Sequence, residues 1–347
     1  MGLVTAETTP FSSRIKSLLK FVFFLSLGFF VIWLSLRNLT PAEESQILDS
    51  FRHANYNWVA LVIILGICSH ILRALRWRIF FEPMGYHPGL KNTFYAVMVG
   101  YFANMAFPRL GEVTRCGILA RYENIPFNKS FGTVITERAL DMILFFLLFF
   151  LMVFTQIGTI GNYLSTHVYP GLKGKFFDPF TNPLIIISLL FIVILFFAGV
   201  YFFRKKIGQT KVYLKIKELI HGFWEGLKAL AKIRHPFLFI FYSVMIWVLY
   251  FFMLYFCFFC FPQTSGLTAG AGLSALVLGS VGIMITPGGI GLYPAIIQET
   301  LLLYGIHKTT GLALGWISWS AQTVMILCVG GLSLILLSFN KNKNGQN

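Results

Sequence analysis

The chain has 347 residues, of which 56% are hydrophobic and only 12% are charged, against about 25% charged residues in ordinary soluble domains. A water-soluble globular fold is excluded, because a soluble core cannot bury that much apolar surface. The net charge of +15 does not indicate a nucleic-acid-binding protein, since the Lys and Arg residues lie in short stretches beside apolar segments. We therefore predict an all-α polytopic membrane protein whose partners are membrane lipids and do not include nucleic acid.

Six apolar segments reach or approach the ~20 residues that a helix needs to cross the hydrocarbon core of a bilayer. They must be helices, because lipid offers the backbone no hydrogen-bond partner. The first segment follows a basic arm and resembles a signal peptide, but no small-residue cleavage site follows it, so we predict a retained span. The predicted spans are 21–36, 56–72, 131–155, 183–203, 237–261 and 311–338.

Basic residues predict the orientation of these spans, because Lys and Arg accumulate in the cytoplasmic loops of membrane proteins. Both ends of the chain are basic, and so is the stretch after the span 183–203. We therefore predict cytoplasmic termini, and we take the membrane to be the cytoplasmic (inner) membrane of a bacterium. The cytoplasmic markers are Arg14, Lys16 and Lys20, then Arg73, Arg76 and Arg78, then the basic residues of 204–217, and finally Lys341 and Lys343.

Two further apolar segments do not fit this orientation as single crossings. The segment 92–130 must begin and end on the cytoplasmic side, and the segment 267–305 must leave and return to the outer face. We predict that both are re-entrant helical hairpins; the alternative is that each is a pair of slightly short ordinary spans. The predicted bends carry Pro108 and Gly111 in the first hairpin, and Pro287, Gly288, Gly289 and Gly291 in the second.

The order of the predicted elements suggests an inverted repeat within a single membrane domain, 1–347. Each half, 1–160 or 180–340, has two spans, a hairpin and one more span, and the halves start on opposite sides of the membrane. Transporters of this kind hold their substrate near the midplane. Within the second half, the segment 204–236 has a basic amphipathic pattern typical of a helix on the cytoplasmic leaflet, although a plain linker helix would show the same pattern.

On insertion scales, each charged residue at membrane depth raises the free energy of membrane insertion by ~2.5–3.5 kcal/mol, so the presence of each one needs an explanation. In the first hairpin, a helix after Gly111 would place Glu112 and Arg115 one turn apart, with Arg109 near the bend. Two arginines around one glutamate suit a phosphate or a phosphate-bearing lipid headgroup. The alternative is a cytoplasmic loop whose charged side chains extend to the interface.

A second charged group, Glu137, Arg138 and Asp141, lies early in the span 131–155. Its spacing predicts a charged cap that faces the helix bundle, and we expect it to pair with the arginines of the first hairpin. A structural clamp explains these residues as well as substrate contact does, because breaking a buried ion pair costs ~3–5 kcal/mol whatever the function.

The second hairpin offers backbone groups in place of charge. Its glycines permit positive φ and close approach, and N–H groups at a helix start bind anions. The sequence is not a P-loop, because the Lys-Ser/Thr ending is absent. The alternative is a merely flexible break. No cofactor or metal site is predicted.

Four elements together resemble the flippase-like membrane family that includes the transmembrane region of lysylphosphatidylglycerol synthases. They are Arg76-Trp77 after the second span, the run from Asn104 to Arg115, Glu137-Arg138 with Asp141, and the run from Pro287 to Gly291, and they cover essentially the whole chain in order. The resemblance implies movement of an aminoacylated phospholipid or a polyprenyl-linked lipid across the membrane. Many relatives have a Glu after the glycine run where this chain has Tyr293-Pro294, which leaves the headgroup open.

The resemblance also bears on enzymatic activity. Lysyl-transferring members carry a soluble catalytic domain after the membrane part, and this sequence ends at Asn347, so we expect no transferase activity. The favoured function is a lipid translocase; the alternatives are a membrane-embedded enzyme of lipid or glycolipid synthesis and a non-catalytic scaffold for a membrane partner enzyme. The predicted substrate-binding residues are Arg76, Asn104, Arg109, Glu112, Arg115, Glu137, Arg138 and Asp141.

Overall fold

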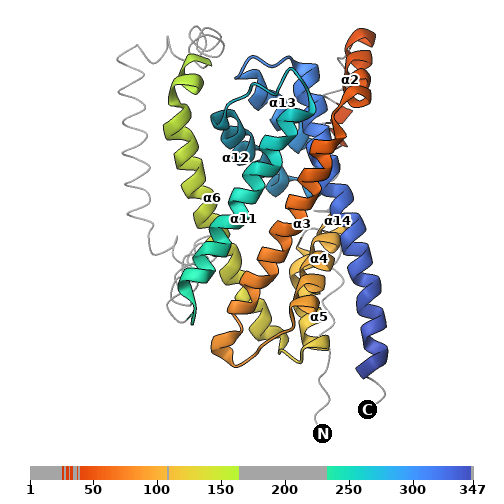
Figure 1. The fold of residues 1–347 in the computed structure, drawn as a ribbon, viewed down its shortest axis with the longest axis vertical. Coiled ribbons are helices and arrows are strands. Elements are labelled where there is room, and N and C mark those ends of the chain that lie inside the picture. Colours follow the sequence, from red (N-terminus) through yellow and green to blue (C-terminus); the bar gives the residue numbers. More distant parts are fainter. Residues whose placement is uncertain are drawn as a thin grey trace, which may run out of the picture. The chain divides into compact units, whose positions relative to one another are not determined.

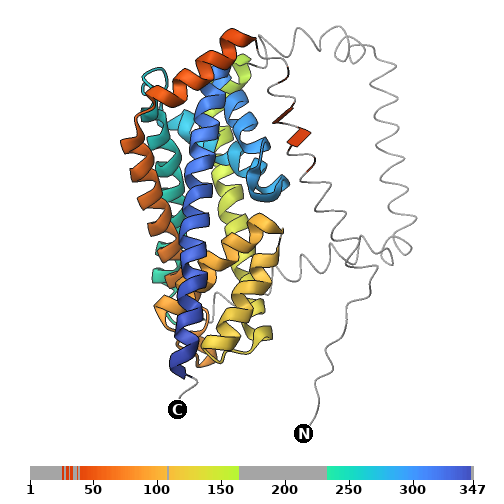
Figure 2. The same ribbon diagram turned by 90° about the vertical axis from the view of Figure 1, so that its right-hand side faces the viewer.

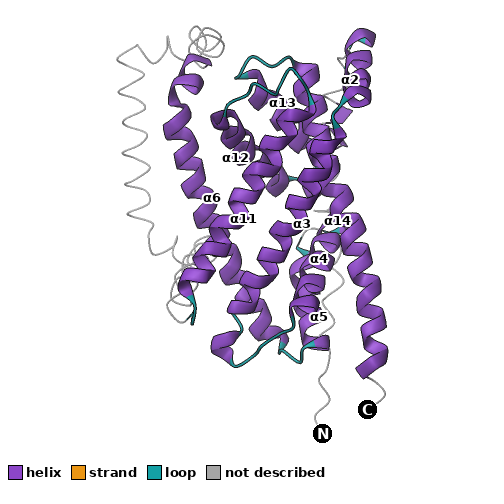
Figure 3. Ribbon diagram, viewed as in Figure 1, coloured by secondary structure: helices purple, strands orange, loops and turns teal. Residues whose placement is uncertain are grey.

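The computed structural model describes residues 40–107, 109–163 and 233–344, together with a few isolated positions before residue 40. These residues are mostly helical and include no strand, which confirms the predicted all-α class (Figure 3). The chain divides into two compact units. Unit 1 comprises residues 1–134 and 233–347, and unit 2 comprises residues 135–232, of which 135–163 are described.

Four helical stretches in the described part of the chain are long and apolar enough to cross a membrane. They coincide with the spans predicted at 56–72, 131–155, 237–261 and 311–338, so the chain is a multi-pass membrane protein. Most of the predicted span 21–36, the whole of 183–203 and nearly all of the basic segment 204–236 lie outside the described residues. The four stretches are Tyr56–Met84 (α3, Tyr56–Ile79, and η1, Glu82–Met84), Phe127–Thr159 (within α6, Phe127–Tyr163), Pro236–Cys260 (α11, Pro236–Cys257, and η4, Phe258–Cys260) and Lys308–Phe339 (within α14, Lys308–Asn344).

Two pairs of shorter helices form hairpins in unit 1. The first pair is α4 (Leu90–Ala106) and α5 (Leu110–Tyr122), and the second is α12 (Ala269–Ile285) and α13 (Leu292–Leu302), with η5 (Pro287–Gly289) at its bend. The two pairs lie toward opposite ends of unit 1, α12–α13 in the upper part and α4–α5 in the lower (Figures 1 and 2). The longest of these helices has 17 residues, or about 25 Å of helix, which is less than a hydrocarbon core of ~30 Å.

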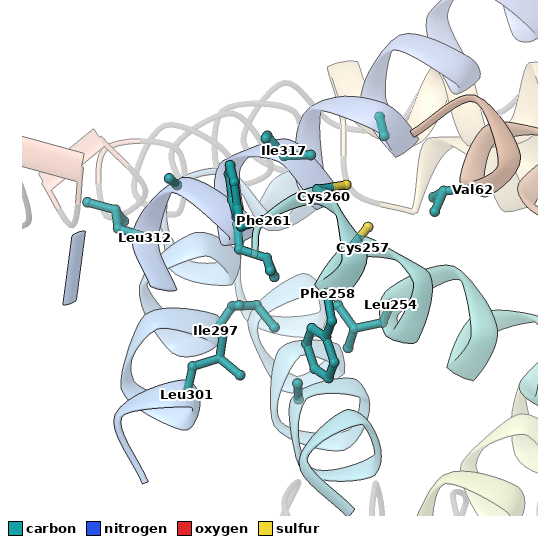
Figure 4. Packing of buried hydrophobic residues seen from close by; sticks show 14 of the residues in the cluster. Val62, Leu254, Cys257, Phe258, Cys260, Phe261, Ile297, Leu301, Leu312 and Ile317 are labelled. Carbon is teal, nitrogen blue, oxygen red and sulfur yellow. The ribbon is translucent and has the colours of Figure 1, made fainter. Parts of the chain in front are cut away.

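The upper part of unit 1 is held together by an apolar core between α11, η4, α13 and α14 (Figure 4). Helices in lipid gain little from the hydrophobic effect, so they associate through close packing. Cys257 and Cys260 belong to this core as buried free thiols. Other members of the core are Leu254, Phe258, Phe261, Ile297, Leu301, Leu312 and Ile317.

Helix α14 packs against both hairpins through glycines. A Cβ atom at Gly315 would lie 2.7 Å from the Cα and the carbonyl oxygen of Pro294 in α13. A Cβ atom at Gly330 would lie 2.8 Å from the Cβ of Phe102 and 3.0 Å from the carbonyl oxygen of Met98, both in α4. The absence of a side chain at each position therefore lets the helices approach closely.

Helix α2 (Pro41–His53) lies across the upper end of unit 1 and packs on α14 (Figure 2). It begins with a capping box: the hydroxyl of Thr40 accepts from the Glu43 N–H at 3.3 Å, and the Glu43 carboxylate accepts from the Thr40 N–H at 2.8 Å. Ile47 is buried, and the Thr309 hydroxyl donates to Gln46 Oε1 at 3.3 Å, so one face of α2 is fixed to the start of α14.

The capping box should make the start of α2 sensitive to acid. Backbone and side-chain hydrogen bonds from Thr40 hold the pKa of the Glu43 carboxyl below its ordinary value of 4.5. The ionised Glu43 carboxylate therefore stabilises the start of α2 fully at a pH above 4.5, and this stabilisation is lost as the pH falls through the lower pKa of the folded state. We expect hydrogen exchange, corrected for its intrinsic pH dependence, to show the first turn of α2 losing protection in that acid window. Glu43→Gln should abolish the transition, and an unchanged transition in this variant would contradict the prediction.

Candidate functional site

Two arginines of α3 are buried within unit 1. Arg73 and Arg76 are 4% and 0% exposed, because α3 continues to Ile79 and carries both side chains into the bundle. Arg73 and Arg76 therefore lie within the helix and not in a loop after it, and that the three arginines mark the cytoplasmic side stays a prediction. Arg78 lies at the helix end, where its Nε donates to the carbonyl oxygen of Pro88 at 2.8 Å.

The two buried arginines reach polar side chains of α11. Arg73 Nη2 donates to the Tyr250 hydroxyl at 3.0 Å, and Arg76 Nη1 donates to Ser243 Oγ at 3.3 Å. The guanidinium of Arg76 also lies 5.9 Å from the ring centroid of Phe239. A buried cation is costly unless it is hydrogen-bonded, so these contacts are part of what makes the burial tolerable.

Arg115 of the first hairpin is buried against α3. Its Cζ lies 4.7 Å from the ring centroid of Trp77, and the Trp77 indole N–H donates to the Thr133 hydroxyl at 2.9 Å. Thr133 in turn donates to the carbonyl oxygen of Ser130 at 2.7 Å, so the indole ring is held in one orientation. A cation over an indole face contributes ~2 kcal/mol or more when it is desolvated. Trp77 is therefore a fixed platform for the Arg115 guanidinium.

The bend of the first hairpin is closed by Asn104. Its Oδ1 accepts from the Gly111 N–H at 2.7 Å, and a Cβ atom at Gly111 would overlap the carbonyl oxygen of Gly100. Helix α5 begins at Leu110, which confirms the predicted helix after the bend and places Glu112 one turn before Arg115. Pro108 lies outside the described residues.

Arg109 has an unusual backbone conformation at this bend. Its φ of 67° lies in the left-handed region, and its side chain is exposed. A non-glycine residue pays ~1–2 kcal/mol for this conformation. An arginine is thus present where glycine would be free of strain, which favours a role for its side chain.

The second charged group lies on α6, in unit 2. Glu137 is buried, and Arg138 and Asp141 are half-buried, one turn apart on the helix. The expected pairing of this group with the arginines of the first hairpin stays a prediction.

The bend of the second hairpin has the positive φ values that its glycines predict: 60° at Gly288, 74° at Gly289 and 71° at Gly291. The N–H groups of Gly289 and Ile290 donate to backbone carbonyls within the turn at 3.0 and 3.3 Å, so these two donors are not presented to an anion. The carbonyl oxygen of Gly288 accepts from the Trp319 indole N–H of α14 at 2.8 Å, and η5 contacts α4. The two hairpins therefore meet at this bend.

The bond from Trp319 should hold the second bend in place. Trp319→Phe removes the donor but keeps an aromatic ring, so we expect a loss of about 1 kcal/mol in the free energy of unfolding. Cysteine labelling of an Ile290→Cys protein, at a half-buried position of the bend with negative φ, should become faster when Trp319→Phe is added. Trp58→Phe, at the start of α3, serves as the control. Equal labelling rates in all three proteins would show that the bond does not restrain the bend.

Sequence reasoning missed a polar group next to the predicted site: His70, Arg73, Tyr101 and Tyr250. The rings of His70 and Tyr101 are 4.5 Å apart, and the Arg73 guanidinium lies 5.8 Å from the Tyr101 ring. The available signal was the pair His70 and Arg73, two ionisable residues one turn apart in an apolar helix.

Comparison with known proteins places the chain in a family. A UPF0104 membrane protein of Methanocaldococcus jannaschii is 22% identical over 308 residues, which cover 84% of this chain and 88% of the relative. A UPF0104 membrane protein of Methanothermobacter thermautotrophicus is 25% identical over 280 residues, covering 71% and 75%. Both relatives are archaeal, so they lend no support to the predicted bacterial source.

A more limited similarity links the chain to glycosyltransferase AglD of Haloferax volcanii, at 24% identity over 102 residues, which are 29% of this chain and 16% of that protein. No solved structure matches the chain. The family model described as lysylphosphatidylglycerol synthase TM region matches residues 17–330. The chain therefore belongs to the lysylphosphatidylglycerol synthase TM region family, as the sequence resemblance predicts.

Proposed function

We propose that the chain is a translocase that moves a lipid with an anionic headgroup, such as an aminoacylated phospholipid or a polyprenyl-linked lipid, across the cytoplasmic membrane. The observation that carries this proposal is the burial of Arg115 on Trp77 in a short helical hairpin within a membrane-spanning bundle. A guanidinium fork buried within such a bundle suits a pair of phosphate oxygens. The family description, which names the membrane region of a lipid synthase, supports a lipid substrate.

We propose further that both hairpins are re-entrant and that both termini are cytoplasmic. The hairpin helices are too short for a full crossing, the two pairs lie toward opposite ends of unit 1, and η5 reaches α4. An inverted repeat with halves 1–160 and 180–340 in one domain would produce this arrangement. Transporters built in this way hold the substrate between broken helices and move one part against the other.

The predicted site residues take different parts in this proposal. Arg109 and Arg115 bind the headgroup, and the strained φ of Arg109 supports its role. The glycine bend of the second hairpin allows the gate to move. The residues that set the geometry around the two arginines are Arg76, Asn104, Glu112, Glu137, Arg138 and Asp141.

Transport can be tested in proteoliposomes that contain fluorescent phosphatidylglycerol, by following the fraction that an external quencher reaches. Arg115→Ala should lower the rate to that of protein-free vesicles, because the headgroup loses its buried cation. Arg121→Ala, at an exposed arginine of the same helix, should leave the rate unchanged. Arg115→Lys keeps the charge but not the fork, and it should give a reduced rate in a folded protein. A folded Arg115→Ala protein with the normal rate would exclude the proposed role.

A second candidate function is a membrane scaffold or enzyme of glycolipid assembly, and the partial similarity to a glycosyltransferase is what favours it. In an enzyme, the same Glu and Arg residues would act as acid, base and phosphate clamp at the cytoplasmic interface. A scaffold would lose binding to a partner enzyme in Arg115→Ala while the lipid distribution between the leaflets stayed unchanged. The proteoliposome measurement separates these functions from transport.

A further inference from the structure

A histidine lies at the centre of a membrane span. The span Tyr56–Met84 has 29 residues, and His70 has fourteen of them on either side. Arg73 follows one turn later, about 4.5 Å further along the axis. Ionisable residues at the middle of a span are expensive, and they mark substrate or ion pathways in membrane proteins.

His70 is almost completely enclosed. It is 5% exposed, and its buried Nδ1 has no hydrogen-bond partner among the described residues. Its ring lies against Tyr101 of α4, with ring centroids 4.5 Å apart. A buried polar atom without a partner costs ~1–3 kcal/mol, so its presence indicates a ligand that completes the bonding.

The neighbouring Arg73 supplies positive charge at the same level. It donates to the Tyr250 hydroxyl of α11 at 3.0 Å, and its guanidinium lies 5.8 Å from the ring of Tyr101. Helices α3, α4 and α11 thus bring an imidazole, a guanidinium and two phenols together. We call His70, Arg73, Tyr101 and Tyr250 the midspan cluster.

The midspan cluster is separate from the arginines of the proposed headgroup site. Arg73 and Arg76 reach α11 at Tyr250 and Ser243, which are seven residues and therefore about 10.5 Å apart along that helix. Trp77, the platform for Arg115, likewise lies seven residues beyond His70 on α3. One phosphate group therefore cannot occupy both levels at once.

We propose that the midspan cluster is a second phosphate-binding site, which receives the headgroup of the lipid after it leaves Arg115. This inference rests on the proposed transport function. The Nδ1–H of His70 donates a hydrogen bond to one phosphate oxygen. The positively charged guanidinium of Arg73, positioned by Tyr250, attracts a second phosphate oxygen. The headgroup thereby reaches the hydrocarbon centre, where an anion is least stable, in a step of about 10 Å from the level of Arg115.

The site can be tested by NMR on protein labelled with ¹⁵N-histidine in a maltoside detergent without phosphate. The chain has seven histidines, and the signal lost in His70→Gln identifies His70. We expect short-chain phosphatidylglycerol to shift this signal, and diacylglycerol of the same chain length to leave it in place. Tyr250→Phe should weaken the titration about tenfold, because Arg73 loses a hydrogen-bonded partner. Tyr255→Phe on the same helix is the matched control and should titrate normally.

The outcomes distinguish the source of the phosphate and separate this site from transport. A shift with phosphatidylglycerol but not with inorganic phosphate supports a lipid site, whereas a shift with both supports a phosphate site open to the free ion. The absence of a shift with either probe overturns the second site. If transport depends on Arg115 but the His70 signal does not shift, the proposed second site is wrong and the proposed translocase stands. If the His70 signal shifts but no transport is measured, the proposed translocase is wrong and the phosphate site stands.

Discussion

Adding one methyl group at Gly111 is expected to destabilise the first hairpin and to abolish lipid transport. The Cβ atom of Gly111→Ala would overlap the carbonyl oxygen of Gly100 and lie 2.8 Å from Cγ of Asn104. Gly100 is inside α4, so its carbonyl cannot move without bending that helix. Overpacking of this kind costs ~1–3 kcal/mol, and the hydrogen bond from Gly111 to Asn104 adds about 1 kcal/mol. We therefore expect a total loss of about 3 kcal/mol.

Gly117 provides the matched control for this prediction. It lies in the same helix, and a Cβ atom there would meet nothing within 4 Å. Gly117→Ala should be neutral or should stabilise the protein by up to ~1 kcal/mol, because alanine favours the helix. Thermal unfolding in detergent and the proteoliposome rate would be measured for both variants. Equal stability and transport in the two would show that α4 and α5 do not need this close contact.

Replacing Trp77 should produce the second large effect. Trp77 is fully buried, and its ring lies under the Arg115 guanidinium. Trp77→Leu removes most of the buried ring, and truncations of buried Trp or Phe cost ~3–5 kcal/mol, so a loss of about 3 kcal/mol is expected together with loss of transport. Trp77→Phe keeps a ring beneath Arg115, so it should retain more transport than Trp77→Leu.

Thr133→Val separates the indole hydrogen bond from the ring face. This change leaves the indole ring in place but removes the hydrogen-bond acceptor of the Trp77 N–H, so we expect the free energy of unfolding to fall by ~1–3 kcal/mol. Measuring thermal unfolding and transport of the Trp77 and Thr133 variants would show how much of the effect comes from the indole hydrogen bond and how much from the ring face. Trp58→Leu, near the other end of α3, is the control and should leave transport intact. If Trp77→Leu transports as fast as Trp58→Leu, Trp77 does not position Arg115.

Hydropathy locates the described spans well, but it does not locate their ends. The span predicted at 56–72 stops at Arg73 because the apolar run stops there, whereas α3 continues to Ile79. The continuation depends on Tyr250 and Ser243, which are 177 and 167 residues away from the arginines they contact. Partners so distant cannot be read from local pattern, and this is why two buried arginines resemble loop markers in the sequence.

The hairpins were more predictable, because their bends are encoded locally. Proline and glycine mark both bends, and the positive φ values of Gly288 and Gly291 follow from residue type. The role of Asn104 as acceptor for Gly111 is less apparent, since an amide in an apolar helix has many potential uses. The family resemblance marks Trp77, but its pairing with Thr133 gives no sequence signal, because it depends on how α3 packs against the start of α6.

The two glycine contacts of α14 have a consequence for motion. Gly315 contacts α13 and Gly330 contacts α4, and these two glycines are fifteen positions, or about 22 Å, apart along one continuous helix. If α14 moves as a rigid body, a tilt of α14 caused by one hairpin also moves the surface of α14 that contacts the other hairpin. In the proposed translocase, opening at one end and closing at the other would then be coupled through a single movement of α14.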